Sequence, residues 1–324
     1  MKKSLIALAV LAASGASFAQ SNVTLYGVAD IMLQSVDDGT NTTTKLESGG
    51  IDTSRWGMKG SEDLGGGLKA NFKMEAAVGL DTGASTGFSR ESWVGLSGGF
   101  GEIRLGKVSS AFNDIEGAAG PVFGSATFGT MGLAFESDFQ ETGRPTNTIY
   151  YAAPAMGGFN AAVSYSLDEE TTTGVEVVSL GLSYEGGPLY VSGGYQSEQA
   201  TTAGAEKIGI TQLNVTYDLG SVKLLGALGF VDNSYGVAGD DVSEWLIGVD
   251  VPLSSALILS AGYASSTRSF ASGAADDEKT AFSIGARYYL SKRTSVYTMA
   301  QYNKLDSVVD VDGSGFAVGV NHKF

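Results

Sequence analysis

Residues 280–290 read TAFSIGARYYL, and their side chains alternate between two kinds. Every second position is apolar: Phe282, Ile284, Ala286, Tyr288 and Leu290. The positions between them carry the small, polar or charged residues of the segment: Ser283, Gly285, Arg287 and Tyr289. Because successive side chains of a strand point to opposite faces, this pattern predicts a β-strand with one apolar face and one polar face.

The same alternation recurs along the whole chain, from VTLYGVADI at 23–31 to FAVGVNHKF at 316–324. About sixteen segments show it, with ends placed to within about three residues. They are 22–35, 53–61, 68–80, 88–98, 101–107, 146–153, 159–168, 175–185, 188–197, 206–217, 221–232, 242–251, 256–267, 278–290, 294–304 and 313–324.

The connections between these segments alternate in length. Tight connections such as DLGGG (63–67) and EGGP (185–188) are followed by longer polar ones such as VDDGTNTTTKLESGGID (36–52). Up-and-down barrels of the outer membrane alternate short periplasmic turns with long external loops. We therefore predict an all-β fold, a sixteen-stranded antiparallel transmembrane β-barrel. A soluble secreted β-sandwich is the alternative, although such domains usually mix their loop lengths.

The composition agrees with many strands joined by turns. The chain has 46 glycines, 5 prolines and 10% aromatic residues, which does not suit a disordered chain. It has no cysteine, so thiolate metal sites and thiol nucleophiles are excluded. Its net charge of −15 argues against nucleic acid as a partner, because that binding rests on Lys and Arg.

The first residues, MKKSLIALAVLAASGASFAQ, place two lysines before a short apolar run and small residues. This pattern predicts a secretory signal peptide over 1–19, with cleavage before Gln20. Residues 20–324 then form a single barrel domain. We expect the protein to be exported to the cell outer membrane, with outer-membrane lipid around it.

One connection breaks the alternation of lengths. About forty residues separate Lys107 from Asn147, and they are rich in Gly, Phe and Ala. A loop this long in a regular barrel is either functional or disordered, and its apolar content favours packing against a wall. We expect this third external loop to fold into the lumen.

Side-chain parity turns several basic residues toward the inside of the barrel. If Trp93 is a lipid-facing aromatic, Arg90 points inward. Outward apolar neighbours place Lys73 and Arg104 inward in the same way. A lysine or arginine on the lipid face near mid-membrane would cost about 2–4 kcal/mol, so these residues are expected to line water.

Six co-linear segments resemble one known family over nearly the whole chain. They are SNVTLYGVAD (21–30), SRWGMKGSEDLGGGLKANFKME (54–75), SRESWVGLSGGFGEIRLGK (89–107), RPTNTIYYAAPAMGGF (144–159), YYLSKRTSVYTMAQY (288–302) and VGVNHKF (318–324). Together they are similar to the Gram-negative general porins, in particular the β-proteobacterial and neisserial type. The resemblance implies a homotrimer of sixteen-stranded barrels, each with a water-filled pore that the third external loop narrows.

The resemblance also implies roles for individual residues. Arg55, Arg90 and Arg144 match the basic cluster of the family's constriction, and Asp114 and Glu116 lie where its early-loop acidic pair would be. Two more loop carboxylates come later in the same segment: Glu136 and Asp138. The terminal aromatic, Phe324, resembles the signal that the outer-membrane assembly machinery reads.

The expected function is passive diffusion of ions and small hydrophilic solutes, with a weak preference for anions and no cofactor. A substrate-specific porin for small organic anions is the runner-up. A structural or adhesive barrel is less favoured, because sixteen strands enclose too wide a lumen for side chains alone to fill.

We do not expect an enzyme. A membrane hydrolase needs a serine–histidine pair, and the only histidine, His322, lies in the last predicted strand. The chain has no histidine cluster and no HExxH motif, so no metal site is predicted. The acidic connections near 238–244 and 274–279 are interpreted as solvated loops.

Overall fold

The computed structural model describes residues 22–167, 176–199, 204–308 and 310–324. The predicted signal peptide, 1–19, and its cleavage point lie outside these residues. The described residues form seventeen strands: β1 (Asn22–Asp37), β2 (Thr42–Ser48), β3 (Arg55–Gly65), β4 (Leu68–Ala77), β5 (Glu91–Gly98), β6 (Gly101–Lys107), β7 (Thr148–Ala152), β8 (Phe159–Ser166), β9 (Val177–Gly186), β10 (Leu189–Gln199), β11 (Lys207–Asp218), β12 (Lys223–Asp232), β13 (Asp241–Pro252), β14 (Leu257–Ser269), β15 (Asp277–Tyr289), β16 (Thr294–Asp306) and β17 (Val311–Lys323). Among these residues no helix is long and apolar enough to cross a membrane.

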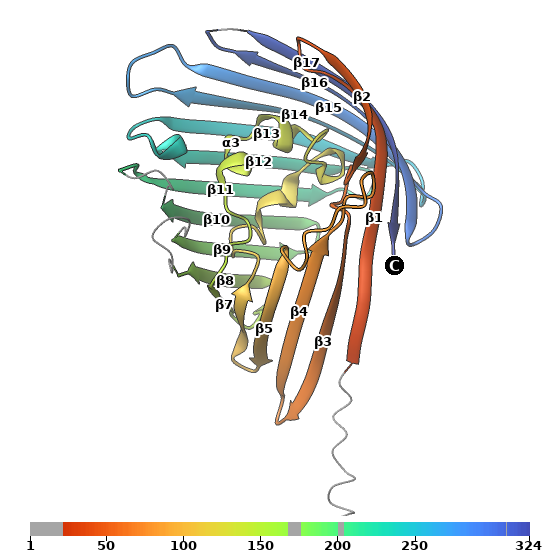
Figure 1. Ribbon diagram of the computed structural model, residues 1–324, viewed down its shortest axis with the longest axis vertical. Coiled ribbons are helices and arrows are strands. Elements are labelled where there is room, and N and C mark those ends of the chain that lie inside the picture. The colour runs from red at the N-terminus through yellow and green to blue at the C-terminus, as the bar shows by residue number, and fades with distance from the viewer. Residues whose placement is uncertain (1–21, 168–175, 200–203, 309) are drawn as a thin grey trace, which may run out of the picture.

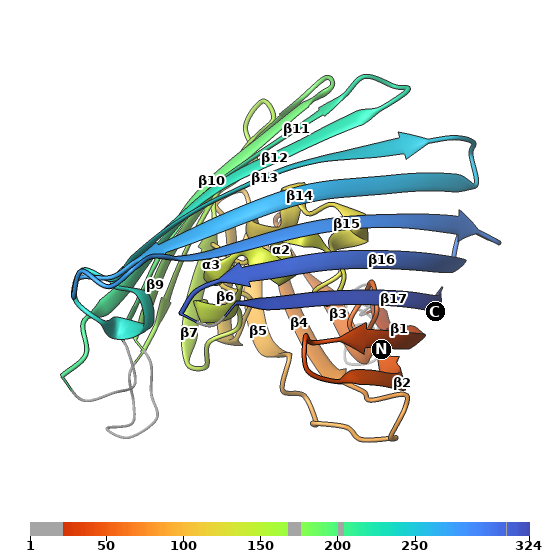
Figure 2. The same cartoon turned by 90° about the horizontal axis from the view of Figure 1, so that it is seen from above.

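The strands form one antiparallel sheet that closes on itself. Each strand from β3 onward pairs with the next one along the chain, and β17 returns to pair with β1. At this seam Val28 lies opposite Lys323, and Asp37 lies opposite Ser314. Figures 1 and 2 show the sheet curving around the yellow segment that follows β6. Closure removes the open edge that a sheet cannot leave unpaired in lipid.

The second barrel strand is made of two pieces. Both β2 and β3 pair with the same edge of β1, β2 with Ile31–Asp37 and β3 with Asn22–Val28. Residues 49–54 interrupt them. The barrel therefore has sixteen strands, as predicted, although the sequence pattern placed 36–52 in a loop and so missed β2.

The two faces of the sheet differ in polarity, in the direction that a membrane barrel requires. On β12, Leu224, Leu228 and Phe230 are 47%, 49% and 47% exposed, whereas Leu225 and Val231 are buried. Many buried side chains of the opposite face are polar: Ser164, Ser179, Ser192, Gln196, Gln212 and Asn214. Apolar side chains outside and polar ones inside are the reverse of a soluble domain and match a barrel in lipid.

The glycines of DLGGG make the turn between β3 and β4 possible. Gly65, Gly66 and Gly67 have φ of 85°, 61° and 82°. A side chain with a Cβ is strained in this left-handed region, so glycine is the residue that closes such a turn without cost.

The long connection between β6 and β7 packs against the inner face of the sheet. It contains four short helices: η1 (Glu116–Ala119), η2 (Val122–Gly124), α2 (Thr130–Ala134) and α3 (Glu136–Gln140). Phe112, Phe128 and Phe135 of this loop are fully buried. Phe112 packs in a cluster with wall residues of β11, β12 and β13, Phe128 with β1, β16 and β17, and Phe135 with β12 to β15. This packing explains why the loop is rich in apolar residues.

Wall side chains also bind the backbone of the loop. The N–H groups of Ala111 and Phe112 donate to Ser164 Oγ (3.1 Å) and Ser179 Oγ (2.6 Å). The N–H of Glu136 donates to the carboxylate of Glu244, at 2.8 Å. These bonds satisfy backbone groups that have no strand partner. These three bonds fix the loop to β8, β9 and β13.

Candidate channel wall and constriction

The inner face of β3, β4 and β5 carries a group of basic residues around Glu75. This carboxylate is 3% exposed. It accepts from Arg90 Nε at 2.8 Å and lies 3.4 Å from Lys73 Nζ and 3.8 Å from Arg55 Nε. Tyr26 of β1 donates its hydroxyl to the same carboxylate, at 2.8 Å. The structure therefore brings together three of the expected basic residues, but around a wall carboxylate that the sequence interpretation had not assigned.

The strand register corrects the expected orientation of Trp93. In the pairing of β4 with β5, Trp93 lies opposite Lys73 and Glu75 lies opposite Glu91, so all four side chains share the inner face. The indole Nε1 of Trp93 donates to Glu91 at 2.8 Å, and Lys73 Nζ lies 2.5 Å from the same carboxylate. Trp93 is therefore not a lipid-facing aromatic, as the parity argument assumed.

Arg90 nevertheless points inward. It precedes β5, which begins at Glu91, so the alternation of the strand does not apply to it. Its side chain turns to Glu75, and its backbone N–H donates to Glu75 O at 3.1 Å. The expected direction of Arg90 agrees with the structure, while the reason given for it was wrong.

Arg104 lies between two aromatic rings on the inner face. Its guanidinium carbon is 5.0 Å from the Trp93 ring centre and 4.7 Å from that of Tyr150. Its Nη2 lies 2.6 Å from Glu102, which neutralises its charge. Stacking and pairing together fix the position of this guanidinium.

Arg144, at the end of the long loop, approaches the same wall. Lys107 Nζ donates to its carbonyl oxygen at 2.6 Å. Burial and the neighbouring charge of Arg90 lower the pKa of Arg144 from its ordinary value. Within the described residues, neither Arg144 nor Lys107 forms an ion pair with a carboxylate.

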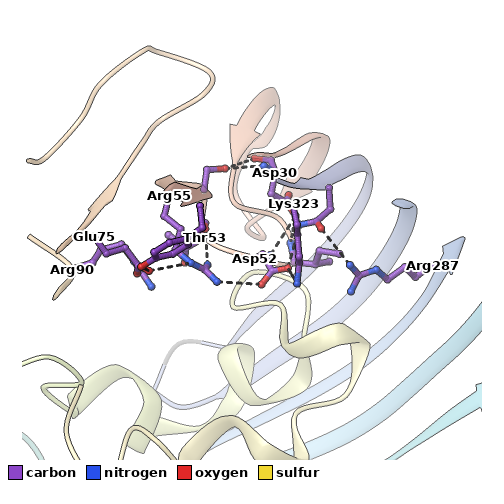
Figure 3. Close-up of polar contacts among 12 residues, drawn as sticks. Asp30, Asp52, Thr53, Arg55, Glu75, Arg90, Arg287 and Lys323 are labelled. Atoms are coloured by element: carbon purple, nitrogen blue, oxygen red, sulfur yellow. Dashed lines mark hydrogen bonds and ion pairs between the residues drawn. The ribbon is translucent and has the colours of Figure 1, made fainter. Parts of the chain in front are cut away.

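The charged contacts continue around the barrel as a belt, which Figure 3 shows. Arg55 Nη2 lies 3.9 Å from Asp52, and Lys323 Nζ of β17 lies 3.1 Å from the other oxygen of that carboxylate. We use the name inner-wall belt for the six residues in this row: Arg90, Glu75, Arg55, Asp52, Lys323 and Arg287. They are positioned by β3, β4, β15 and β17, by the connection before β5 and by the interruption between β2 and β3.

Buried Asp30 anchors this interruption. Its carboxylate accepts from the backbone N–H of Gly50 at 2.8 Å, from Tyr297 Oη at 2.5 Å and from Asn321 Nδ2 at 2.7 Å. Asp30 is fully buried, and its partners come from three separate parts of the chain. The sequence carries one signal for this site, an Asp between the apolar residues Ala29 and Ile31.

The two expected loop carboxylates differ in their surroundings. Asp114 is exposed and accepts from the Tyr150 hydroxyl at 2.7 Å, close to Arg104. Glu116, in contrast, is 6% exposed and accepts from Asn113 Nδ2 at 3.1 Å. Burial and the charge of nearby Glu141 raise its pKa well above the ordinary value. Glu116 is therefore buried among residues of the loop and does not face the basic residues. The sequence-based expectation for this residue was wrong.

The loop carries three further carboxylates: Glu136, Asp138 and Glu141. Asp138 is half-buried, and Glu136 is 5% exposed, with its carboxylate bound by Tyr235 Oη at 2.7 Å and by Lys279. Burial, followed by the charges of Asp138 and Glu198, raises the pKa of Glu141 to about 7. Glu136 is thus bound to the supporting wall, and Glu141 to Asn113 of the loop itself.

The side chains of this wall are fixed charges on the inner face of a closed sheet. Within the described residues, no group of three or more His, Cys, Asp or Glu side chains could hold a metal ion. Fixed charges along a water-filled path instead create a field that acts on passing ions. A closed sheet with an apolar outer band and a charged interior defines a transmembrane β-barrel.

Comparison with known proteins places this barrel in a family. A family model described as Gram-negative porin matches residues 5–307. Outer membrane porin protein 32 of Delftia acidovorans is 35% identical over 342 residues, which cover 98% of this chain and 95% of that protein. Major outer membrane protein P.IB of Neisseria meningitidis is 28% identical over 347 residues, with both chains fully covered.

Solved structures agree with this result. An anion-selective porin from Comamonas acidovorans superposes with a TM-score of 0.83 at 28% identity, over 94% of this chain and 100% of that one. The trimer form of OmpT from Vibrio cholerae has a TM-score of 0.73 at 18% identity, over 94% of this chain and 99% of that one, and shows the shared fold alone. The chain belongs to the Gram-negative porin family and is a protein of the outer membrane.

Proposed function

We propose that the protein is a general diffusion porin, a passive channel for ions and small hydrophilic solutes, with a weak preference for anions and no enzymatic activity. The observation that carries the proposal is the distribution of charge and bulk inside the barrel. The loop packs mainly against β8 to β17, with further contacts to β1, β7 and residues 50–51. Four basic side chains lie on the inner face of β3 to β6 or next to it: Arg55, Lys73, Arg90 and Arg104. The water path then runs between the loop and this basic wall.

The preference for anions follows from incomplete pairing on this wall. Glu75, Glu91 and Glu102 neutralise part of its charge. Arg144 adds positive charge beside Arg90 and forms no ion pair with a carboxylate among the described residues. Excess positive charge at the narrowest point raises the local concentration of anions. The anion-selective porin from Comamonas acidovorans, 28% identical, supports the same reading.

On the acidic side of the constriction, the proposal keeps Asp114. Its carboxylate is exposed and lies near Arg104. Burial removes Glu116 from this role. We further propose a homotrimer, the form named for OmpT, and a domain that spans 20–324 after removal of 1–19.

Single-channel recording in planar bilayers tests the proposal. A general porin gives large ohmic steps, in groups of three for a trimer, and a reversal potential that shows a weak anion preference. A small conductance that one organic anion blocks at micromolar concentration would instead indicate the substrate-specific alternative. Arg90→Ala is expected to shift the reversal potential toward cations, because it removes a positive charge from the wall. No shift would remove Arg90 from the constriction.

A further inference from the structure

Arg287 is the residue of the inner-wall belt that has no carboxylate partner. Arg90 pairs with Glu75, and Lys323 pairs with Asp52. In the described part of the chain, the partners of Arg287 are neutral: its Nε donates to Ser295 Oγ at 3.0 Å, and its Nη2 donates to Asn321 Oδ1 at 3.3 Å. Its guanidinium therefore has no direct ion pair, and the carboxylates of Asp30 and Asp52 reach it only through the amide of Asn321.

The guanidinium of Arg287 is held in one orientation. Ser295 and Asn321 are each 1% exposed. The amide nitrogen of Asn321 donates to Asp30 at 2.7 Å and to Asp52 at 3.2 Å, so its oxygen is left to face Arg287. The Tyr289 ring lies 4.8 Å below the guanidinium carbon. Figure 3 shows Arg287 at the end of the row: Lys323 lies between it and Arg55.

The position of Arg287 along β15 places its guanidinium beside the long loop. Two residues earlier, the Cα of Gly285 faces Val122 and Phe123 of the loop, so that a Cβ there would lie 2.9 Å from Val122 Cγ1. After Arg287, β15 ends at Tyr289, before the short turn that leads to Thr294. Short turns of such barrels lie on the periplasmic side. Arg287 therefore lies just past the loop on the way to the periplasm.

We propose that Arg287 forms a second anion-binding station, specific for small carboxylates, on the periplasmic side of the constriction. An immobilised guanidinium presents its N–H groups in a planar fork that matches a carboxylate. Since Ser295 and Asn321 occupy only two of its five N–H groups, the others remain for a passing anion. The station rests on the proposed anion-preferring path, because an anion reaches it after leaving the wall around Arg90 and Arg144.

The test compares three variants of the full chain in planar bilayers. Arg287→Gln removes the charge and keeps a side chain that can bond to Asn321. Arg287→Lys keeps the charge and loses the planar fork. Arg293→Gln, in the exposed turn that follows β15, is the matched control. Reversal potentials in gradients of potassium acetate and of potassium chloride give the permeability of each anion relative to potassium.

We expect Arg287→Gln to lower the relative permeability of acetate by about two- to three-fold, and that of chloride by less. Arg287→Lys is expected to restore the chloride value but not the full acetate value, and Arg293→Gln to behave as the wild type. An Arg287→Gln channel with wild-type conductance and an unchanged acetate permeability would overturn the proposal.

A wild-type channel that prefers cations would contradict the proposed function. The anion-binding station would then be judged by the acetate permeability of Arg287→Gln alone. A further loss of acetate permeability in Arg287→Gln would still support the station. In such a channel, an acetate permeability that Arg287→Gln leaves unchanged would refute both the proposed function and the anion-binding station. Equal amounts of heat-stable oligomer from all variants show that folding is not the cause of a difference.

Discussion

At the scale of single residues, Glu75 decides how positive the wall is. Three basic side chains, Arg55, Lys73 and Arg90, lie within 4 Å of its carboxylate, which is almost fully buried. A buried carboxylate in this position neutralises part of their charge and holds them in place. In the proposed channel, the charge of the wall therefore depends on this residue as well as on the arginines.

Glu75→Gln is expected to increase the preference for anions. The change removes one negative charge, while the amide still accepts a hydrogen bond from Arg90 or Tyr26. We expect the chloride-to-potassium permeability ratio to rise by about two-fold at low salt and by less at high salt, where charges are screened. The reversal potential in a potassium chloride gradient measures this ratio. Glu62→Gln, an exposed position near the end of β3, is the control, and an equal rise in both variants would contradict the role of Glu75.

The sequence predicts the direction of the basic residues but not their partners. Parity alone turns Lys73 and Arg104 inward, because each lies in an alternating strand. The ion pairs depend on the register between neighbouring strands, which parity does not supply. Trp93 was placed outward because aromatic residues are common at the lipid interface. Its hydrogen bond to Glu91 and its stacking on Arg104 keep it inside.

At the scale of elements, the wall strands contain glycines where the long loop comes closest. Gly262 of β14 and Gly248 of β13 both face the Pro121 ring, and a Cβ at Gly262 would collide with it. Ser260, two residues before Gly262, accepts a hydrogen bond from Val122 N at 2.7 Å. The alternation of small residues that first indicated a strand thus also provides the space in which the loop lies.

Gly262→Val is expected to push the loop away from β14 and into the water path. We expect a lower single-channel conductance, together with a loss of about 1–3 kcal/mol in the free energy of unfolding, as overpacking usually causes. Gly226→Ala in β12 is the control, since a Cβ there lies at an ordinary 3.4 Å from Val215. A Gly262→Val channel with unchanged conductance would show that the loop does not limit the current.

The loop carboxylates predict a dependence on pH. Burial raises the pKa of Glu116 and of Glu141, and Asn113 Nδ2 bridges the two carboxyl groups. In the unfolded chain these groups lose their protons at lower pH than in the folded loop. Their contribution to stability is therefore fully present at acidic pH and is lost as the pH rises through their raised pKa values, about 7 for Glu141.

We therefore expect the loop to open more readily between pH 6 and pH 9 than at pH 5. Hydrogen exchange of the amides in 108–147, corrected for the intrinsic rate, measures this opening. Glu141→Gln resembles the protonated form and is expected to weaken the dependence on pH. Opening that becomes rarer as the pH rises would show that the carboxylates are ionised in the folded loop.

The sequence could predict the length and apolar character of the loop, but not which strands support it. Its supports, such as Ser164, Ser179 and Glu244, lie far along the chain and carry no local signal. The strand β2 was missed for a related reason. Its residues, TTTKLES, are polar at most positions, and only pairing with β1 shows them to be a strand.

At the scale of the whole molecule, the barrel depends on the seam between its first and last strands. The sequence predicts both strands from their alternation, and the pairing of β17 with β1 confirms that the barrel closes. The buried Asp30 adds hydrogen bonds across this region to β16 and β17. The seam thus joins two strands that lie nearly the whole chain apart, and closing so long a loop carries an entropic cost that these contacts must offset.

Phe324 completes the seam through both its backbone and its ring. Its N–H and C=O exchange hydrogen bonds with Gly27, each of 3.0 Å. Its ring lies over Gly27, where a Cβ would collide with it, and half of the side chain remains exposed. The backbone contacts close the sheet, while the exposed aromatic ring is the part that an assembly machinery would contact.

Two changes at Phe324 separate these contributions. Deletion of Phe324 removes both the hydrogen bonds and the ring, whereas Phe324→Ala keeps the hydrogen bonds. If the ring is the assembly signal, both variants are expected to reach the outer membrane at several-fold lower levels, while the channels that do form conduct as the wild type. Phe324→Trp keeps an aromatic ring and is the matched control. Quantitative immunoblots of outer-membrane fractions measure the levels, and equal levels of Phe324→Ala and wild type would leave the ring with a role in the seam alone.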